Sequence, residues 1–92
     1  MKRLRFIGAS QDDLSGFPDE ARRAAGYELW QVQKGLMPSD WKHMVGVGQG
    51  AYEIRIHVLG EWRVIYVAKF ADSVCVLHAF QKKTPKTRHE DI

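Results

Sequence analysis

Apolar residues recur at helical spacing in the first half of the chain. Between residues 18 and 35 they stand three or four positions apart, which places side chains on one face of an α-helix. The positions on this face are Ala21, Ala25, Leu29, Val32 and Leu36. Pro18 suits the first helical turn, and Gly35 is typical of a helix end. The pattern predicts an amphipathic helix over residues 18–35.

Two shorter elements are expected before this helix. A weak alternation of apolar and polar residues over residues 3–8 predicts a first strand. Ser10, with Asp13 three positions later, resembles a capping box, in which two side chains close the first turn of a helix. We expect one short helical turn to begin there.

From residue 52 the apolar period changes to two, which is typical of strands. Residues 52–58, 62–70 and 74–80 give three such runs with short breaks between them, so we expect an antiparallel meander. The third run is apolar on both faces and should lie inside the sheet. The fold class is therefore α+β, with an N-terminal strand and helices packed on one face of a small antiparallel sheet.

Length and apolar content fit one domain. The 92 residues, of which 45% are hydrophobic, support a single modest core spanning residues 1–92. The residues that follow Met1 are charged, and no apolar run approaches the roughly 20 residues that cross a bilayer. We expect a cytoplasmic protein that makes no membrane contact.

Charge is unevenly distributed along the chain. The formal net charge is +3, from 14 Lys and Arg against 11 Asp and Glu. Four cations near the C-terminus precede the next acid, Glu90: they are Lys82, Lys83, Lys86 and Arg88. A clustered basic edge suits a polyanion such as RNA. A solubilising tail has the same composition, so charge alone leaves both interpretations open.

Two kinds of site are disfavoured. The glycine-rich residues 46–50 precede a strand rather than a helix and carry no Walker lysine, so we interpret them as a flexible connection and not as a phosphate loop. The four histidines lack helical metal-ligand spacing, and Cys75 is the single cysteine. We expect neither a metal nor a cofactor.

The polar face of the predicted hairpin carries candidate chemistry. Arg55 and Arg63 should lie near each other across the turn. An anionic ligand would explain the pair, because guanidinium groups bind phosphate in a bidentate manner. Alternatively, Glu53 and Glu61 neutralise the two arginines as surface ion pairs. The sequence leaves both interpretations open.

Two histidines could transfer a proton near neutral pH. His78 stands in an otherwise apolar strand, where a histidine satisfied in the core is the alternative. His57 shares the face of Arg55 and is the second candidate. Cations that stabilise charge on a phosphate, together with a proton acceptor and a donor, are sufficient for phosphodiester cleavage without a metal.

Three runs resemble a known family. They are Tyr52-Glu53-Ile54-Arg55-Ile56, Trp62-Arg63-Val64-Ile65-Tyr66, and Val76-Leu77-His78-Ala79-Phe80-Gln81-Lys82-Lys83-Thr84. Together they are similar to the phage-related HigB-like toxins of the RelE/ParE superfamily, and Trp41-Lys42 fits the same pattern. The resemblance covers roughly residues 2–92.

The resemblance implies a toxin of a type II toxin–antitoxin system that cleaves mRNA on the ribosome without a metal. It also implies a helix-turn-helix, HigA-like antitoxin and an oligomeric toxin–antitoxin complex. By motif position, Arg55 and Arg63 would hold the scissile phosphate, His78 would be the acid–base residue, and Lys82 and Lys83 would bind RNA. His57 remains the alternative acid–base residue because it shares the face of Arg55, and the basic cluster adds Lys86 and Arg88 to the expected RNA contacts.

Two alternatives to the ribonuclease remain open. The ParE branch of the superfamily inhibits DNA gyrase, and a non-catalytic RNA-binding module could use the same fold. Residues 88–92 also resemble the first turn of a terminal helix that family members continue, so we expect a domain that lacks this helix. Tyr66 should belong to the core, because its parity in the strand matches that of Val64.

Overall fold

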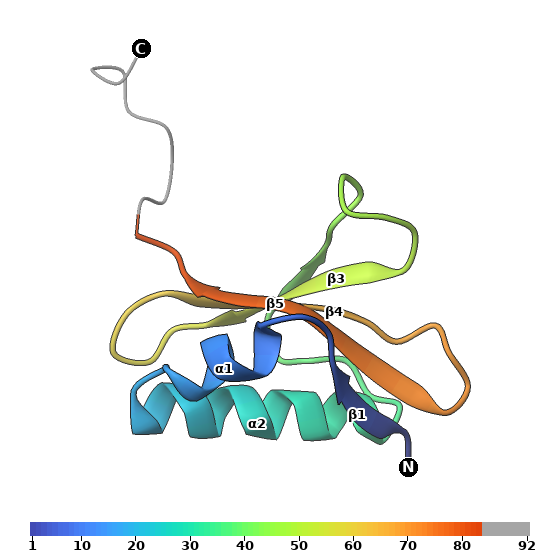
Figure 1. The fold of residues 1–92 in the computed structure, drawn as a ribbon, viewed down its shortest axis with the longest axis horizontal. Helices are drawn as coiled ribbons and strands as arrows, with labels where there is room; N and C mark the ends of the chain where they lie inside the picture. Colours follow the sequence, from blue (N-terminus) through green and yellow to red (C-terminus); the bar gives the residue numbers. More distant parts are fainter. Residues whose placement is uncertain (84–92) are drawn as a thin grey trace.

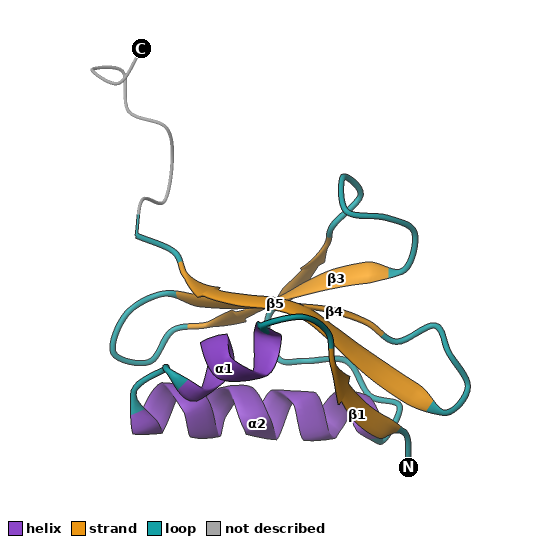
Figure 2. Ribbon diagram, viewed as in Figure 1, coloured by secondary structure: helices purple, strands orange, loops and turns teal. Residues whose placement is uncertain are grey.

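A five-stranded sheet with two helices on one face is formed by residues 1–83, the part of the chain that the computed structural model describes (Figure 1). The helices are α1 (Ser10–Ser15) and α2 (Asp19–Gln33). The strands are β1 (Arg3–Phe6), β2 (Trp41–His43), β3 (Ala51–Ile56), β4 (Trp62–Val67) and β5 (Ser73–Gln81). The expected α+β class is confirmed, with both helices on the same side of the sheet (Figure 2).

The sheet has the strand order β1-β5-β4-β3-β2 and is mixed rather than antiparallel throughout. The meander β3-β4-β5 is antiparallel as predicted, and β5 is an interior strand. The N-terminal strand was expected to pack on a face of the sheet, and this was wrong. Instead β1 pairs in parallel with residues 73–76 and extends the sheet. Its backbone thereby satisfies the hydrogen-bonding groups along that edge of the buried strand β5.

Helix α2 begins and ends close to the predicted positions. At its C-terminus the backbone N–H of Leu36 donates to the carbonyl of Gln31 (3.0 Å), and that of Gly35 donates to the carbonyl of Val32 (2.9 Å). These two bonds form a Schellman motif, and Gly35 has the left-handed φ of +90° that the motif requires. Leu36 therefore lies beyond the helix and is 51% exposed, so its predicted place on the buried face was wrong.

Helix α1 is present, but Ser10 does not cap it. The residue at the N-cap is Ala9, and no side chain bonds the first turn. The Ser10 hydroxyl is buried and donates to the carbonyl of Val76 on β5 (3.0 Å). The expected capping box was wrong because this hydroxyl joins the helix to the sheet.

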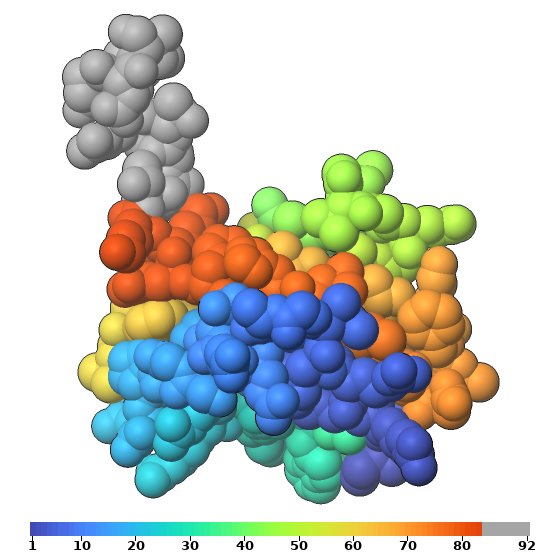
Figure 3. Space-filling model, viewed as in Figure 1, coloured from blue at the N-terminus to red at the C-terminus, as the bar shows by residue number. Residues whose placement is uncertain are grey.

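The core lies between α2 and the sheet. Fully buried side chains come from the predicted helix face and from alternate positions of the strands: Ala21, Ala25, Leu29, Ile54, Val64, Tyr66, Val74 and Val76. Burial of Tyr66 confirms its assignment to the core and raises the pKa of its hydroxyl. The glycine-rich residues 46–50 connect β2 to β3 and project beyond the sheet in the space-filling view (Figure 3).

A bulge in β5 changes which face its later residues occupy. Ile65 pairs with His78, whereas the next residue of β4, Tyr66, pairs with Val76, so Leu77 is an extra residue in the ladder. Strict alternation would place His78 on the core face with Val76. The bulge moves it to the opposite face, which we call the outer face.

Candidate functional site

The outer face of the sheet carries polar side chains in rows that run across the strands. Because directly paired residues of antiparallel strands point to the same face, the register defines these rows. One row is Arg55, Arg63 and Phe80, and the next is Lys42, Glu53, Ile65 and His78. Among the described residues both helices lie on the other side of the sheet, so no helix covers this face (Figure 1).

Arg55 and Arg63 are direct cross-strand partners, and one carboxylate lies between their side chains. The Glu53 Oε1 atom is 3.6 Å from Arg55 Nε and 3.8 Å from Arg63 Nε. Neither Nε has a hydrogen-bond partner within the described chain. Like charges directly opposite each other on a sheet are destabilising. The shared carboxylate offsets that repulsion and keeps the two guanidinium groups together.

Further acids contact the outer parts of the two arginines. Arg63 Nη1 donates to Glu61 Oε1 and to the carbonyl of Trp62, both at 3.0 Å. Arg55 Nη1 is 3.9 Å from Asp40 Oδ1. The arginines are therefore adjacent, as the hairpin predicted, and they are also matched by carboxylates. The sequence had left open whether acids would neutralise them, and the structure brings those acids into contact.

His57 bridges two of these acids. Its Nε2 lies 2.6 Å from Asp40 Oδ2, and its Nδ1 lies 2.8 Å from Glu61 Oε2. The hydrogen bonds to Asp40 and then to Glu61 raise the pKa of the imidazole above 6.5. His57 and Arg63 in turn lower the pKa of the Glu61 carboxyl. Both contacts therefore favour the protonated form of the ring.

Six residues form what we call the outer-face cluster: Asp40, Glu53, Arg55, His57, Glu61 and Arg63. Among the residues that the structure describes, this cluster sets three positive groups against three carboxylates when His57 is protonated. Glu53 and Arg63 are each only 6% exposed, whereas the others reach solvent. The cluster is a built electrostatic site with a buried centre and an accessible rim.

His78 lies beside this cluster and is largely open to solvent. Its ring stacks on Phe80, with 5.0 Å between ring centroids, and its Nδ1 is 3.9 Å from Asp13 Oδ2 on α1. Phe80 is opposite Arg63, so His78 is a diagonal neighbour of Arg63, with their Cα atoms about 7–8 Å apart. The alternative of a satisfied core histidine does not apply, because the side chain is 56% exposed.

The predicted RNA-binding lysines begin where β5 ends. The backbone N–H of Lys82 donates to the carbonyl of Glu61 (2.7 Å), which places Lys82 next to the outer-face cluster. Lys82 is half-buried and Lys83 is exposed. Lys86, Arg88 and the predicted start of a terminal helix lie outside the described residues.

Residues 1–83 contain neither a metal-binding cluster nor a membrane-spanning helix. No group of His, Cys, Asp and Glu side chains there could hold a metal ion. In the outer-face cluster the two acids contact opposite nitrogens of His57, so their oxygens do not converge on one point. In the same part of the chain, no helix has the length and apolarity needed to cross a membrane.

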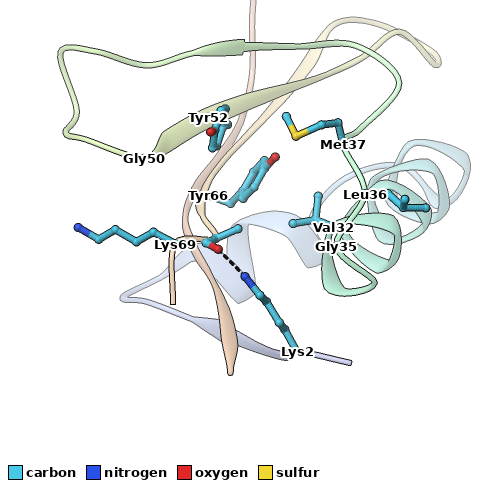
Figure 4. Close-up of a pocket in the computed structure, with 10 residues that line it drawn as sticks. Lys2, Val32, Gly35, Leu36, Met37, Gly50, Tyr52, Tyr66 and Lys69 are labelled. Atoms are coloured by element: carbon cyan, nitrogen blue, oxygen red, sulfur yellow. Dashed lines mark hydrogen bonds between the residues drawn. The ribbon is translucent and has the colours of Figure 1, made fainter. Parts of the chain in front are cut away.

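A cavity of about 210 Å³ lies on the helix side of the sheet, between the end of α2 and the strands β3 and β4 (Figure 4). Tyr52 and Tyr66 stack along one wall with 5.5 Å between ring centroids, and Val32 and Met37 lie opposite. At the rim of the cavity, Lys2 Nζ donates a hydrogen bond to the carbonyl oxygen of Ala68. The outer-face cluster is on the other side of the sheet, so the two features are separate.

Asp40 is the site residue that sequence reasoning missed. It precedes β2, a three-residue strand without a clear period, and it reaches the cluster because β2 pairs with β3. The backbone N–H of Arg55 also donates to the carbonyl of Asp40 (2.9 Å). The position of Asp40 therefore depends on a strand pairing that no local pattern indicates.

The amino-acid sequence matches one known protein family. A sequence model of the family described as phage-derived protein Gp49-like (DUF891) matches residues 12–92. The chain belongs to this Gp49-like family. The match includes most of α1, all of α2, strands β2 to β5 and the whole outer-face cluster. No curated protein sequence matches the chain.

Proposed function

We propose that this Gp49-like protein is the toxin of a type II toxin–antitoxin system and cleaves mRNA on the ribosome. The observation that carries the proposal is the cross-strand pair of Arg55 and Arg63, which lie side by side on the outer face of the sheet. Two guanidinium groups at that spacing suit a phosphodiester, whose non-bridging oxygens accept bidentate hydrogen bonds. The resemblance of the three strand sequences to HigB-like toxins supports the same function.

The proposed reaction is an internal phosphoryl transfer. The 2′-oxygen of one nucleotide attacks the adjacent phosphorus, the bond from phosphorus to the 5′-oxygen breaks, and a 2′,3′-cyclic phosphate forms. The proton of the 2′-hydroxyl passes to a base, and the leaving 5′-oxygen takes a proton from an acid or from water. Arg55 and Arg63 stabilise the charge that develops on the non-bridging oxygens.

His78 is the better acid–base candidate of the two histidines. Both ring nitrogens of His57 already contact carboxylates, so this ring must first lose one of those bonds. His78 has only a loose contact with Asp13 at 3.9 Å and an exposed ring. We therefore assign proton transfer to His78 and keep His57 as the alternative.

The partners follow from the same proposal. Lys82 and Lys83 bind phosphates next to the scissile one, and Lys86 and Arg88 are proposed to continue this contact. Phosphate contacts of this kind are independent of base sequence. A helix-turn-helix antitoxin is proposed to neutralise the toxin in an oligomeric complex, and the ribosome is proposed to present the mRNA.

The test is an mRNA cleavage assay on programmed ribosomes, with cut sites mapped from the new RNA ends. We expect the wild-type protein to cut, and Arg55→Gln to lose about 10²-fold or more in rate, as when one preorganised donor to a developing oxyanion is removed. Arg22→Gln is the matched control, because Arg22 forms an exposed pair with Asp19 on α2. Circular dichroism verifies that each variant is folded.

Intact mRNA with the folded wild-type protein would overturn the ribonuclease proposal. In that case a supercoiling assay with purified gyrase, and an RNA-binding measurement, decide between a gyrase inhibitor and a non-catalytic RNA-binding module. Expression of the chain with and without the neighbouring open reading frame tests the toxin–antitoxin part. Growth arrest that the neighbour does not relieve would contradict it.

A further inference from the structure

We propose that Glu53 is a positioning residue, whose carboxylate fixes Arg55 and Arg63 as a single phosphate-binding fork. This inference rests on the proposed function. Its basis is the depth of Glu53 on the outer face: the residue is 6% exposed, although it belongs to the polar side of its strand. A buried carboxylate is costly unless charged partners surround it. Here the partners are the two arginines of the proposed site.

The contacts define how Glu53 acts. One oxygen, Oε1, faces the Nε atoms of both arginines, at 3.6 and 3.8 Å. These Nε atoms are buried, so Glu53 holds each guanidinium group from its inner side. The terminal Nη1 atoms contact other acids: that of Arg55 is 3.9 Å from Asp40 Oδ1, and that of Arg63 is 3.0 Å from Glu61 Oε1. In Arg55 the side chain is 34% exposed, which leaves its outer nitrogens available to a ligand.

The other two acids of the cluster differ from Glu53 in their exposure. The side chains of Asp40 and Glu61 are both 43% exposed, and each contacts a terminal Nη1 atom. A phosphate can take the place of these two carboxylates, since solvent can hydrate them once they move away. Glu53 has an 8% exposed side chain and no such route to water. It therefore stays in place when a substrate binds.

Without the Glu53 charge, the two guanidinium groups repel each other and no longer share one geometry. Binding of RNA should survive, because the cluster gains a net positive charge and cations attract the phosphate backbone. Catalysis should suffer, because misplacement of a stabilising group by about 1 Å can cost about 10²-fold in rate. The signature of positioning is thus a slower reaction without weaker binding.

The experiment compares Glu53→Gln with Glu20→Gln, which removes the same charge from an exposed position on α2. Single-turnover cleavage on ribosomes gives the rate, and binding of a 2′-deoxy, uncleavable RNA gives the affinity. For Glu53→Gln we expect a rate about 10²-fold lower and an affinity that is unchanged or higher. Glu20→Gln should keep the wild-type rate.

Glu53→Asp tests the geometry without removing the charge. The Asp side chain is shorter by one methylene group, so we expect its carboxylate not to contact both Nε atoms as that of Glu53 does. We expect a lower rate with unchanged RNA affinity. This variant also decides the matter if Glu53→Gln does not fold, because Asp retains the negative charge between the two arginines.

A readout that does not need activity is the pair of Nε–Hε signals of Arg55 and Arg63 in NMR spectra. Both signals should shift in Glu53→Gln, and neither should shift in Glu20→Gln. A folded Glu53→Gln that cuts at the wild-type rate would overturn the positioning role. An inactive wild-type protein would instead overturn the proposed function, and the NMR signals would still show whether Glu53 holds both arginines.

Discussion

At the scale of single residues, His57 couples the outer-face cluster to pH. Its pKa is raised above 6.5, first by Asp40 and then by Glu61. A pKa that is higher in the folded state stabilises the fold fully below the unfolded value and loses that contribution as pH rises through the folded value. The Glu61 pKa is lowered from 4.5, so its contribution is present above that value and is lost on acidification.

The first prediction follows from these two signs. His57→Gln should destabilise the protein most between pH 4.5 and 6.5, where the imidazole is protonated and the Glu61 carboxylate is ionised in both states. The cost should shrink as pH rises through the raised pKa of His57. Urea unfolding of the wild type and the variant over a pH series measures this difference. Glu61→Gln should move the His57 titration, followed by NMR, back towards 6.5. A cost that is the same at every pH would contradict the bridge.

How far single residues could be predicted depends on whether neighbours in sequence determine their surroundings. The adjacency of Arg55 and Arg63 was predictable, because a short hairpin break fixes which residues face each other. The burial of Glu53 was not, since alternation gives the face of a side chain but not how deeply its neighbours cover it. The place of His78 on the outer face could not be predicted for another reason. The bulge at Leu77 moves the later residues of β5 to the faces opposite to those that strict alternation gives.

At the scale of elements, helix α2 and the meander followed from periodicity, whereas pairings between distant segments did not. The helix pattern was strong because four of its five apolar positions, Ala21, Ala25, Leu29 and Val32, belong to the core cluster that the helix shares with the sheet. The parallel pairing of β1 with β5 and the bond from Ser10 to Val76 join residues 66 or more positions apart. No local pattern encodes such contacts, because they depend on where the whole meander returns.

The second prediction concerns Gly26, within α2, and Gly35, just beyond its C-terminus. Gly35 has a φ of +90° in the Schellman motif, so Gly35→Ala should destabilise the protein by about 1 kcal/mol. Gly26 lies exposed in the middle of the helix, and an added Cβ there meets no atom within 4 Å. Gly26→Ala should therefore stabilise the protein by about 0.5–1 kcal/mol. The urea midpoint of unfolding is measured for both variants. Midpoint shifts of the same sign would contradict the left-handed conformation of Gly35 at the end of the helix.

At the scale of the whole molecule, one sheet serves two purposes on its two faces. The face against α2 supplies the apolar core, and the outer face holds the charged cluster. Strand β3 shows this within two neighbouring residues. Ile54 is fully buried against the helices, and Arg55 points to the outer face, where it contacts Glu53 and Asp40. Substitution of Ile54 should therefore change mainly stability, and substitution of Arg55 should change mainly catalysis.

The third prediction tests this separation. Ile54→Ala should cost about 2–5 kcal/mol, from lost burial and the cavity left behind. That is a large share of the roughly 5–14 kcal/mol expected for a domain of this size. Arg55→Gln should cost less, about 1–2 kcal/mol, because its ion pairs at 3.6 and 3.9 Å are loose and Arg63 remains beside the buried Glu53 carboxylate.

The measurement combines urea unfolding with the ribosome cleavage assay, carried out at a temperature where both variants are folded. Ile54→Ala should then retain most of the wild-type rate, because it leaves the outer face in place, while Arg55→Gln should lose it. If Ile54→Ala, once folded, were as inactive as Arg55→Gln, the two faces would be coupled through the strand. The outer-face cluster would then depend on the packing of the core, and its geometry could not be treated as independent of the fold.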